Sequence, residues 1–261
     1  MLELTTSYTL SQIPYITYDA LDEYAEALVR DFAPESLNTP IPVDVDAFLE
    51  FYLNLTVDFR RISYTKKVLG LTAFNEGTVE VMDDESGHVV KLPVEAGTVI
   101  VDSSLNVKRN EQRRRFTMTH EGCHWLIHRN AFATDNPMGP AGIYENQFLA
   151  AKEGRVDYSR SKNERTDIEW MERQADFLAS AILMPKSALR IAFKDYFKFY
   201  GEKPRRIVRG ASPLDDCFAK QLPEYIANIF NVSKRAALIR LEKLTAIVDK
   251  GWHDVRNVRP V

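Results

Sequence analysis

The sequence predicts an α+β fold, in which helices carry the candidate site and a small, mostly antiparallel β-sheet lies alongside. Apolar residues recur at helical spacing in the N-terminal and C-terminal parts of the chain, whereas a central segment is rich in β-branched residues and turn signals. The chain has 261 residues, of which 45% are hydrophobic, and this is enough apolar material for a sizeable core.

Two amphipathic helices are predicted before the sheet. Residues 16–33 place an apolar stripe opposite acidic residues, and Pro34 ends this helix. Residues 44–54 predict the second helix, again from apolar spacing. The two stripes consist of Leu21, Tyr24, Ala25, Leu28 and Phe32 and of Val45, Phe48, Leu49 and Tyr52.

Residues 56–102 predict the sheet. Val, Thr, Leu and Ile are frequent in this segment, and turn signals interrupt it at 75–77, 83–87 and 95–97. Short strands joined by such turns favour antiparallel pairing.

Helices dominate the prediction for the second half of the chain. A helix over 109–129 precedes a long region, 130–165, which is rich in Pro, Gly and polar residues. A region of this length is either a lid or binding loop or a disordered insert, and the sequence leaves both open. Thr166 and Glu169 form a capping box that begins the next helix, and Pro185 ends it.

Three further helices are predicted over residues 186–200, 213–230 and 233–249. We therefore expect a main domain over residues 1–200, with 130–165 as its long loop or insert, and a helical segment over 201–261 that is packed on it or appended to it.

The most informative motif is His120-Glu121-Gly122-Cys123-His124, an HExxH pentapeptide within a predicted helix. Residues four apart lie on the same helix face, so two imidazoles at this spacing can hold one metal ion. Glu121 is adjacent to the first ligand, where a carboxylate can take a proton from water. Three of the five histidines, including His128, fall within this segment. The pattern predicts a zinc hydrolase.

A catalytic zinc usually has three protein ligands, so one more is expected. Glu172 is the candidate, because it lies on the following helix with Asp176 one turn later. A carboxylate at Asp176 could accept the free N–H of a metal-binding imidazole and fix its tautomer. Ala175 and Ala179 are small and allow a close helix approach. The metal itself stays open, because manganese or iron also suits two histidines and a glutamate.

Two segments together resemble a known family. Residues 115–128, RFTMTHEGCHWLIH, resemble the RFTxAHExxHxxLH signature of the ImmA/IrrE metallopeptidases, and residues 172–179, ERQADFLA, followed by Leu183-Met184-Pro185, are similar to that family's second segment. Weaker similarity extends to residues 232–241. In one departure, Cys123 stands where the family commonly has glycine, which bears on the local packing of the helix.

The resemblance implies a zincin-like helical core, with His120, His124 and Glu172 as Zn²⁺ ligands and Glu121 as the general base. It also implies a regulatory endopeptidase that acts on a protein substrate such as a helix-turn-helix repressor, because family members are often encoded with mobile elements, phages or stress regulons. The residue that stabilises the oxyanion is not identified by the sequence, and Tyr144 and Tyr158 are only candidates.

A different class of function remains as an alternative: a DNA- or repressor-binding module with a structural or vestigial metal site. Residues 225–233 loosely resemble a helix-turn-helix and precede Lys234, Arg235 and Arg240, but the positions of a recognition helix, 236–239, are apolar. Residues 203–261 carry twelve Lys and Arg against six acids, an excess that solvated helix faces also explain. Direct nucleic acid binding is therefore not the expectation.

The sequence also predicts the compartment. The first residues lack the pattern of a signal peptide, no apolar run approaches the roughly 18 residues of a membrane helix, and the two cysteines are too few for a disulfide framework. A cytoplasmic protein without a membrane partner is expected. The arginines within 109–115 fit an anion site or a salt-bridged helix face.

Overall fold

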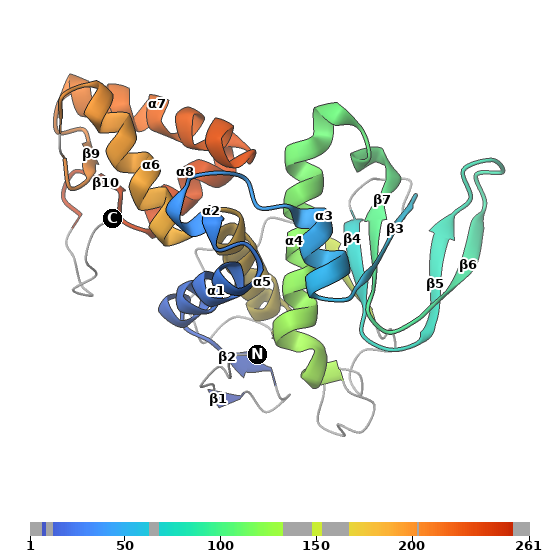
Figure 1. Cartoon of the computed structure of the whole chain (residues 1–261). Helices are drawn as coiled ribbons and strands as arrows, with labels where there is room; N and C mark the ends of the chain where they lie inside the picture. The colour runs from blue at the N-terminus through green and yellow to red at the C-terminus, as the bar shows by residue number, and fades with distance from the viewer. Residues whose placement is uncertain are drawn as a thin grey trace. The chain divides into compact units, whose positions relative to one another are not determined.

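The computed structural model describes residues 7–8, 13–62, 68–132, 148–152, 167–202 and 204–252. It is a mixture of helices and small sheets, as the predicted α+β class requires (Figure 1). By its internal contacts the chain divides into two compact units. Unit 1 consists of Met1–Leu21 and Asp44–Ala179, and unit 2 consists of Asp22–Val43 and Ser180–Val261.

The helices lie close to the predicted ranges. The α-helices are α1 (Tyr18–Phe32), α2 (Glu35–Asn38), α3 (Val45–Ala47), α4 (Glu111–His128), α5 (Asp167–Leu183), α6 (Lys186–Phe199), α7 (Pro213–Phe230) and α8 (Lys234–Lys243). A π-helix, η1 (Phe48–Tyr52), continues α3, and 3₁₀ turns are formed by η2 (Ser103–Leu105), η3 (Lys108–Asn110) and η4 (Arg129–Phe132). The segment predicted as one helix over 44–54 therefore begins at the Asp44 cap and widens to π geometry in its second half.

A four-stranded sheet forms the β part of unit 1. Its order is β3 (Thr56–Arg60), β7 (Thr98–Asp102), β4 (Val68–Ala73) and β8 (Phe148–Lys152). β4 is antiparallel to both of its neighbours, whereas β3 and β7 are parallel. Parallel neighbours need a long connection, and here the chain between them contains β4, β5 and β6. The prediction of a mostly antiparallel sheet is confirmed with this exception.

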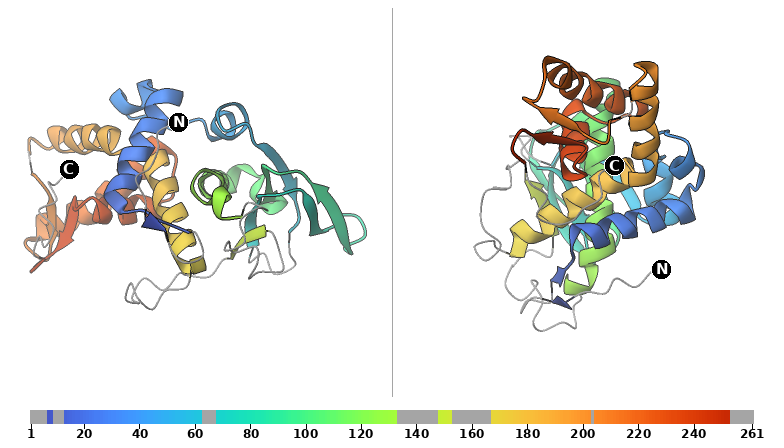
Figure 2. Two further views of the ribbon diagram at one scale, coloured as in Figure 1. Left: turned by 90° about the horizontal axis from the view of Figure 1, so that it is seen from below. Right: turned by 90° about the vertical axis from the view of Figure 1, so that its left-hand side faces the viewer.

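A hairpin of β5 (Gly77–Met82) and β6 (Val89–Val94) shares a core with the sheet. The apolar side chains that meet there are Leu71, Ala73, Val79, Val81, Val94 and Ile100. Helix α4 packs beside β4 and β7, and the hairpin extends on the side of the sheet away from that helix (Figures 1 and 2). The sheet thus covers one face of α4.

Two predicted ranges need correction. The helix predicted over 233–249 ends at Lys243, because Thr245 takes a left-handed backbone conformation with φ 58° and the β-branched residues after it form β10 (Ile247–Asp249). This strand pairs in parallel with β9 (Ile207–Arg209), which the sequence did not predict. The long region 130–165 is not wholly a loop either, since it contains η4 and β8. Short strands β1 (Ser7–Tyr8) and β2 (Pro14–Tyr15) pair near the N-terminus.

Unit 2 packs α6, α7 and α8 with α2 and the β9–β10 pair. Helix α7 begins with the Ser212 cap and Pro213 in its first turn, and Asn231 ends it in a left-handed conformation. Arg240 of α8 is buried and donates to Asp22 Oδ1 at 2.5 Å and to the Met184 carbonyl at 3.2 Å. This arginine therefore belongs to the core of unit 2.

Candidate metal centre

Helix α4 brings His120 and His124 together. They lie four residues apart on one face, and their Nε2 atoms are 2.9 Å apart. Both residues are buried, at 5% and 1% exposure. The i, i+4 spacing of the motif thus produces the paired imidazoles that the sequence predicts.

Helix α5 adds the carboxylate of Glu172. Its Oε2 lies 3.4 Å from His120 Nε2, and its Oε1 lies 3.5 Å from His124 Nε2. One nitrogen from each ring and one oxygen of the carboxylate all lie within 4.8 Å of one another. Zinc bonds of about 2.0–2.2 Å at tetrahedral angles put neighbouring ligand atoms about 3.4 Å apart. The three residues therefore fit a single zinc ion.

The charges of this group are coupled. Burial lowers the pKa of His120, but hydrogen bonds to Asp176 and Glu172 outweigh it, so that the pKa lies well above its ordinary value. Burial likewise raises the pKa of Glu172, but hydrogen bonds from His120 and His124 hold it well below its usual range. Glu172 is therefore an anion, as a divalent cation requires of a carboxylate ligand, whereas the extra proton that the raised pKa places on His120 must leave when a cation binds.

Asp176 lies one turn after Glu172, as predicted. Its Oδ1 is 3.0 Å from Nδ1 of His120, the ring nitrogen that faces away from the ligand group. An acceptor at this position fixes a proton on Nδ1 and leaves Nε2 free to bind metal. Ala175 and Ala179, on the same helix, are fully buried.

The Glu121 side chain is fully buried against strand β4. Its Oε2 lies 2.7 Å from the Thr72 hydroxyl, which can donate to it. Its Oε1 is buried and has no hydrogen-bond partner among the described residues. Burial raises the pKa of Glu121, although His120 and His124 oppose this shift. The structure thus gives one carboxylate oxygen a fixed partner, whereas the other is buried without a hydrogen-bond partner among the described residues.

Gly70 makes room for this carboxylate. A Cβ atom at Gly70 would lie 2.5 Å from Glu121 Oε1 and 2.8 Å from Thr117 Cγ2. No other residue type fits without a shift of its neighbours. Neither Gly70 nor Thr72 is among the predicted site residues, although an isolated glycine within a strand pattern indicates a close approach and could have pointed to Gly70. Thr72 carries no comparable signal.

The packing around Gly122 and Cys123 shows how helix α4 accommodates a cysteine where the family signature commonly has glycine. A Cβ atom at Gly122 would lie 3.3 Å from Leu53 Cδ1 and 3.4 Å from Leu49 Cδ1, so this glycine lies against side chains of η1 and of the residue that follows it. Cys123 is a free, fully buried thiol, and burial raises its pKa well above the ordinary value. The helix therefore accommodates the cysteine without disturbing the paired histidines.

Other candidates are placed differently. Tyr144 and Tyr158 lie outside the described residues, as does the Thr166 end of the capping box. In the arginine cluster, Arg114 makes a bidentate ion pair with Asp46 at 2.6 and 2.9 Å and also binds Glu111 at 3.0 Å. At Arg114 the cluster therefore forms a salt-bridged helix face, which is one of its two predicted interpretations.

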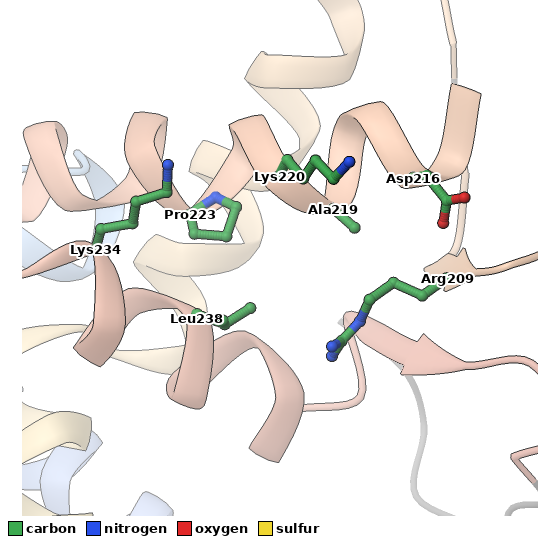
Figure 3. Close-up of a pocket in the computed structure, with 7 residues that line it drawn as sticks. All are labelled: Arg209, Asp216, Ala219, Lys220, Pro223, Lys234 and Leu238. Atoms are coloured by element: carbon green, nitrogen blue, oxygen red, sulfur yellow. The ribbon is translucent and has the colours of Figure 1, made fainter. Parts of the chain in front are cut away.

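Unit 2 contains a separate pocket of about 290 Å³ between α7, α8 and β9 (Figure 3). Its lining residues are Arg209, Asp216, Ala219, Lys220, Pro223, Lys234 and Leu238. Two of its three cations are already paired, since Arg209 binds Glu242 and lies 3.3 Å from Asp249, and Lys234 lies 2.9 Å from Glu224. The pocket is therefore less cationic than its lining suggests.

One family model matches the chain. The model of the IrrE N-terminal-like domain, Peptidase_M78, matches residues 103–242, a range that includes α4, α5 and the candidate metal centre. No curated protein matches the chain significantly. Within the part of the chain that the structure describes, none of the helices has both the length and the apolar character to cross a membrane.

Proposed function

The chain belongs to the IrrE N-terminal-like peptidase family, and on that premise we propose that it is a zinc-dependent endopeptidase. The observation that carries the proposal is the convergence of His120, His124 and Glu172 within 4.8 Å beside the buried carboxylate of Glu121. Two histidines and a glutamate that leave one position open are the ligand set of catalytic zinc. When bound, zinc lowers the pKa of water and polarises the carbonyl of the scissile peptide.

In the proposal, each protein residue has its own role. His120, His124 and Glu172 hold the ion, and Asp176 orients the His120 ring through Nδ1. Glu121 accepts a proton from the attacking water at Oε1 and passes it to the leaving amine, while Thr72 holds Oε2. The raised pKa of Glu121, caused by its burial, suits a group that must both accept and release this proton.

The replacement of Glu121 by glutamine tests the role of the base. The amide keeps the size of the side chain but cannot accept the proton, so cleavage is expected to fall about 10²–10⁴-fold while zinc is retained. Glu111→Gln is the matched control, because it makes the same change on the same helix at a half-buried position outside the ligand group.

The assay works even though the substrate is unidentified. Each zinc-loaded variant is added to a total cell lysate, and newly formed protein N-termini are labelled and identified by mass spectrometry. New termini that are present with the wild type and with Glu111→Gln but absent with Glu121→Gln support the proposal. Equal cleavage by Glu121→Gln and the wild type would exclude Glu121 as the base.

We further propose that the substrate is a regulatory protein, such as a helix-turn-helix repressor, whose cleavage relieves repression. The basis is the resemblance to the ImmA/IrrE metallopeptidases, many of which are encoded with mobile elements. The N-terminal labelling experiment also tests this part. Cleavage sites are expected to concentrate in DNA-binding regulators, and a broad distribution over unrelated proteins would contradict the proposed specificity.

One observation favours the alternative of a DNA-binding module. α7, the turn at Asn231 and α8 follow one another as in a helix-turn-helix, and Lys220 and Lys234 border the pocket beside them. Against it, Arg240 is buried on the inner side of α8. Binding to duplex DNA that weakens steeply with salt would support this alternative, because phosphate contacts release counterions, whereas salt-independent binding or none would remove it.

A further inference from the structure

A chain of hydrogen bonds leads from His124 away from the ligand group. His124 Nδ1 lies 3.0 Å from His128 Nδ1, and His128 Nε2 lies 3.0 Å from Gln174 Oε1. Gln174 Nε2 in turn donates to the backbone carbonyl of Pro14 at 2.7 Å. The three side chains are at most 1% exposed. This series of hydrogen bonds therefore connects α4, α5 and β2 within unit 1, and its side chains are shielded from solvent.

The fixed end of this chain determines the direction of its hydrogen bonds. The Pro14 carbonyl can only accept, so the NH₂ group of Gln174 must face it and the carbonyl oxygen of Gln174 must face His128. That oxygen also can only accept, so His128 carries a proton on Nε2. Only this orientation of the Gln174 amide gives both the Pro14 carbonyl and His128 a suitable hydrogen-bond partner.

The remaining pair is His124 Nδ1 and His128 Nδ1, of which one must donate and the other accept. The His128 side chain is fully buried, and the groups that its ring nitrogens contact, the Gln174 carbonyl oxygen and His124 Nδ1, belong to side chains without a negative charge, so its ring is neutral. A neutral ring that carries its proton on Nε2 has a bare Nδ1, so His128 accepts and His124 donates. His124 therefore bears its proton on Nδ1, and its Nε2, which faces His120 and Glu172, has a free lone pair.

We propose that His128 and Gln174 are positioning residues that fix the tautomer and the ring orientation of His124 for metal binding. The inference rests on the proposed zinc function, since it assigns a purpose to the ligand group. At Nδ1, where His120 contacts the Asp176 carboxylate, His124 contacts His128, and the neutral hydrogen bonds from His128 to the Pro14 carbonyl supply the equivalent acceptor. Loss of such a partner typically weakens metal binding about 10–100-fold.

Four variants of the full chain test the relay. Gln174→Leu and His128→Leu remove the hydrogen bonds at two different points. Gln174→Glu restores an acceptor for His128, and its protonated form can still donate to the Pro14 carbonyl. Met171→Leu is the matched control, because Met171 lies on α5 with the same 1% exposure as Gln174 and the change conserves volume.

The first readout is the dissociation constant for Zn²⁺, measured by competition with a chromophoric chelator at a temperature where circular dichroism shows each variant folded. Gln174→Leu and His128→Leu are expected to bind zinc about 10–100-fold more weakly than the wild type. Gln174→Glu and Met171→Leu are expected to bind close to the wild-type level. Wild-type affinity in both leucine variants would overturn the proposal.

The second readout is ¹⁵N NMR of the histidine rings in the metal-free wild-type chain, which needs no variant to fold. A proton on Nδ1 and a bare Nε2 are expected at His124, with the reverse at His128. A proton on Nε2 of His124 would overturn the relay. If the wild type showed this tautomer pattern but bound no zinc and cleaved no protein, the proposed function would fail while the assigned hydrogen-bond direction stood.

Discussion

Replacing Gly70 by alanine tests whether the sheet controls the position of the proposed base. The added Cβ would lie 2.5 Å from Glu121 Oε1 and 2.7 Å from its Cγ. Ordinary contacts between such atoms are about 3.5 Å or longer, so the Glu121 side chain must move by about 1 Å. The shift is forced because strand β4 offers backbone on one side and Thr117 lies on the other, with its Cγ2 2.8 Å from the new atom.

A misplacement of about 1 Å in a catalytic group costs about 100-fold in rate. Overpacking costs about 1–3 kcal/mol of unfolding free energy, of which about 0.5–1 kcal/mol is offset because alanine is less flexible than glycine in the unfolded chain. Gly70→Ala is therefore expected to stay folded, to bind zinc like the wild type and to lose about 100-fold in kcat. The effect on the rate should exceed the effect on stability.

The assay combines kcat on a substrate identified by its new N-terminus, zinc affinity and urea unfolding. Gly122→Ala is the control, because it adds the same methyl group next to Glu121 but meets only flexible ends, with Leu53 Cδ1 at 3.3 Å. The reasoning is refuted if Gly70→Ala keeps the wild-type kcat. It is also refuted if Gly122→Ala loses as much activity while remaining folded.

Three further changes address the ligand, the base and an ion pair. Thr72→Val removes the hydroxyl that holds the buried carboxylate, and it is expected to lower kcat about tenfold without changing zinc affinity, whereas Thr72→Ser should keep the rate; equal rates in both variants would contradict this. Glu172→Gln replaces the anionic ligand by an amide, so metal analysis should find less than stoichiometric zinc, and full retention would exclude Glu172 as a ligand. The hydrogen bonds from Arg114 hold the pKa of Asp46 below its ordinary value. This group is about half exposed, with 48% of its side chain accessible, so Asp46→Asn should cost only about 0.5 kcal/mol at pH 7. A lowered folded-state pKa stabilises above the unfolded value of about 3.9 and loses its effect as pH falls through the folded value, so urea unfolding should find the cost at pH 7 and a smaller one at pH 3. A cost that grew on acidification would contradict the sign.

The candidate ligands could be predicted because their signals are local. His120 and His124 follow from helical spacing within five residues, and Asp176 follows from Glu172 by the same rule on the next helix. The family match supports the resemblance on which their roles rest. The helix and strand ranges around them were also predictable, because apolar periodicity and turn residues act over short distances.

Long-range contacts could not be predicted. Arg240 counts as a surface cation in the sequence, yet its partner Asp22 is 218 residues away. His128 and Gln174 meet across 46 residues, and neither residue alone indicates a hydrogen bond. The strand β10 was missed for a similar reason, since it depends on pairing with β9 and on the left-handed residue Thr245.

Two of the expectations that stay predictions concern the chain as a whole. The division of the chain between residues 200 and 201 is one of them, because a division by internal contacts does not tell which segment folds or acts alone. The cytoplasmic location is the other. Both concern the behaviour of the chain in the cell and in solution and not the geometry of the metal centre.

The two cysteine thiols of the native chain differ in their reactivity toward alkylating reagents. Cys217 is exposed on α7, whereas Cys123 is enclosed beside His124 and its high pKa keeps it in the unreactive thiol form. An alkylating dye therefore attaches at Cys217 under native conditions and leaves the neighbour of the histidine ligand untouched. The rate of slow labelling at Cys123 then measures how often α4 opens transiently, and the measurement needs no engineered residue.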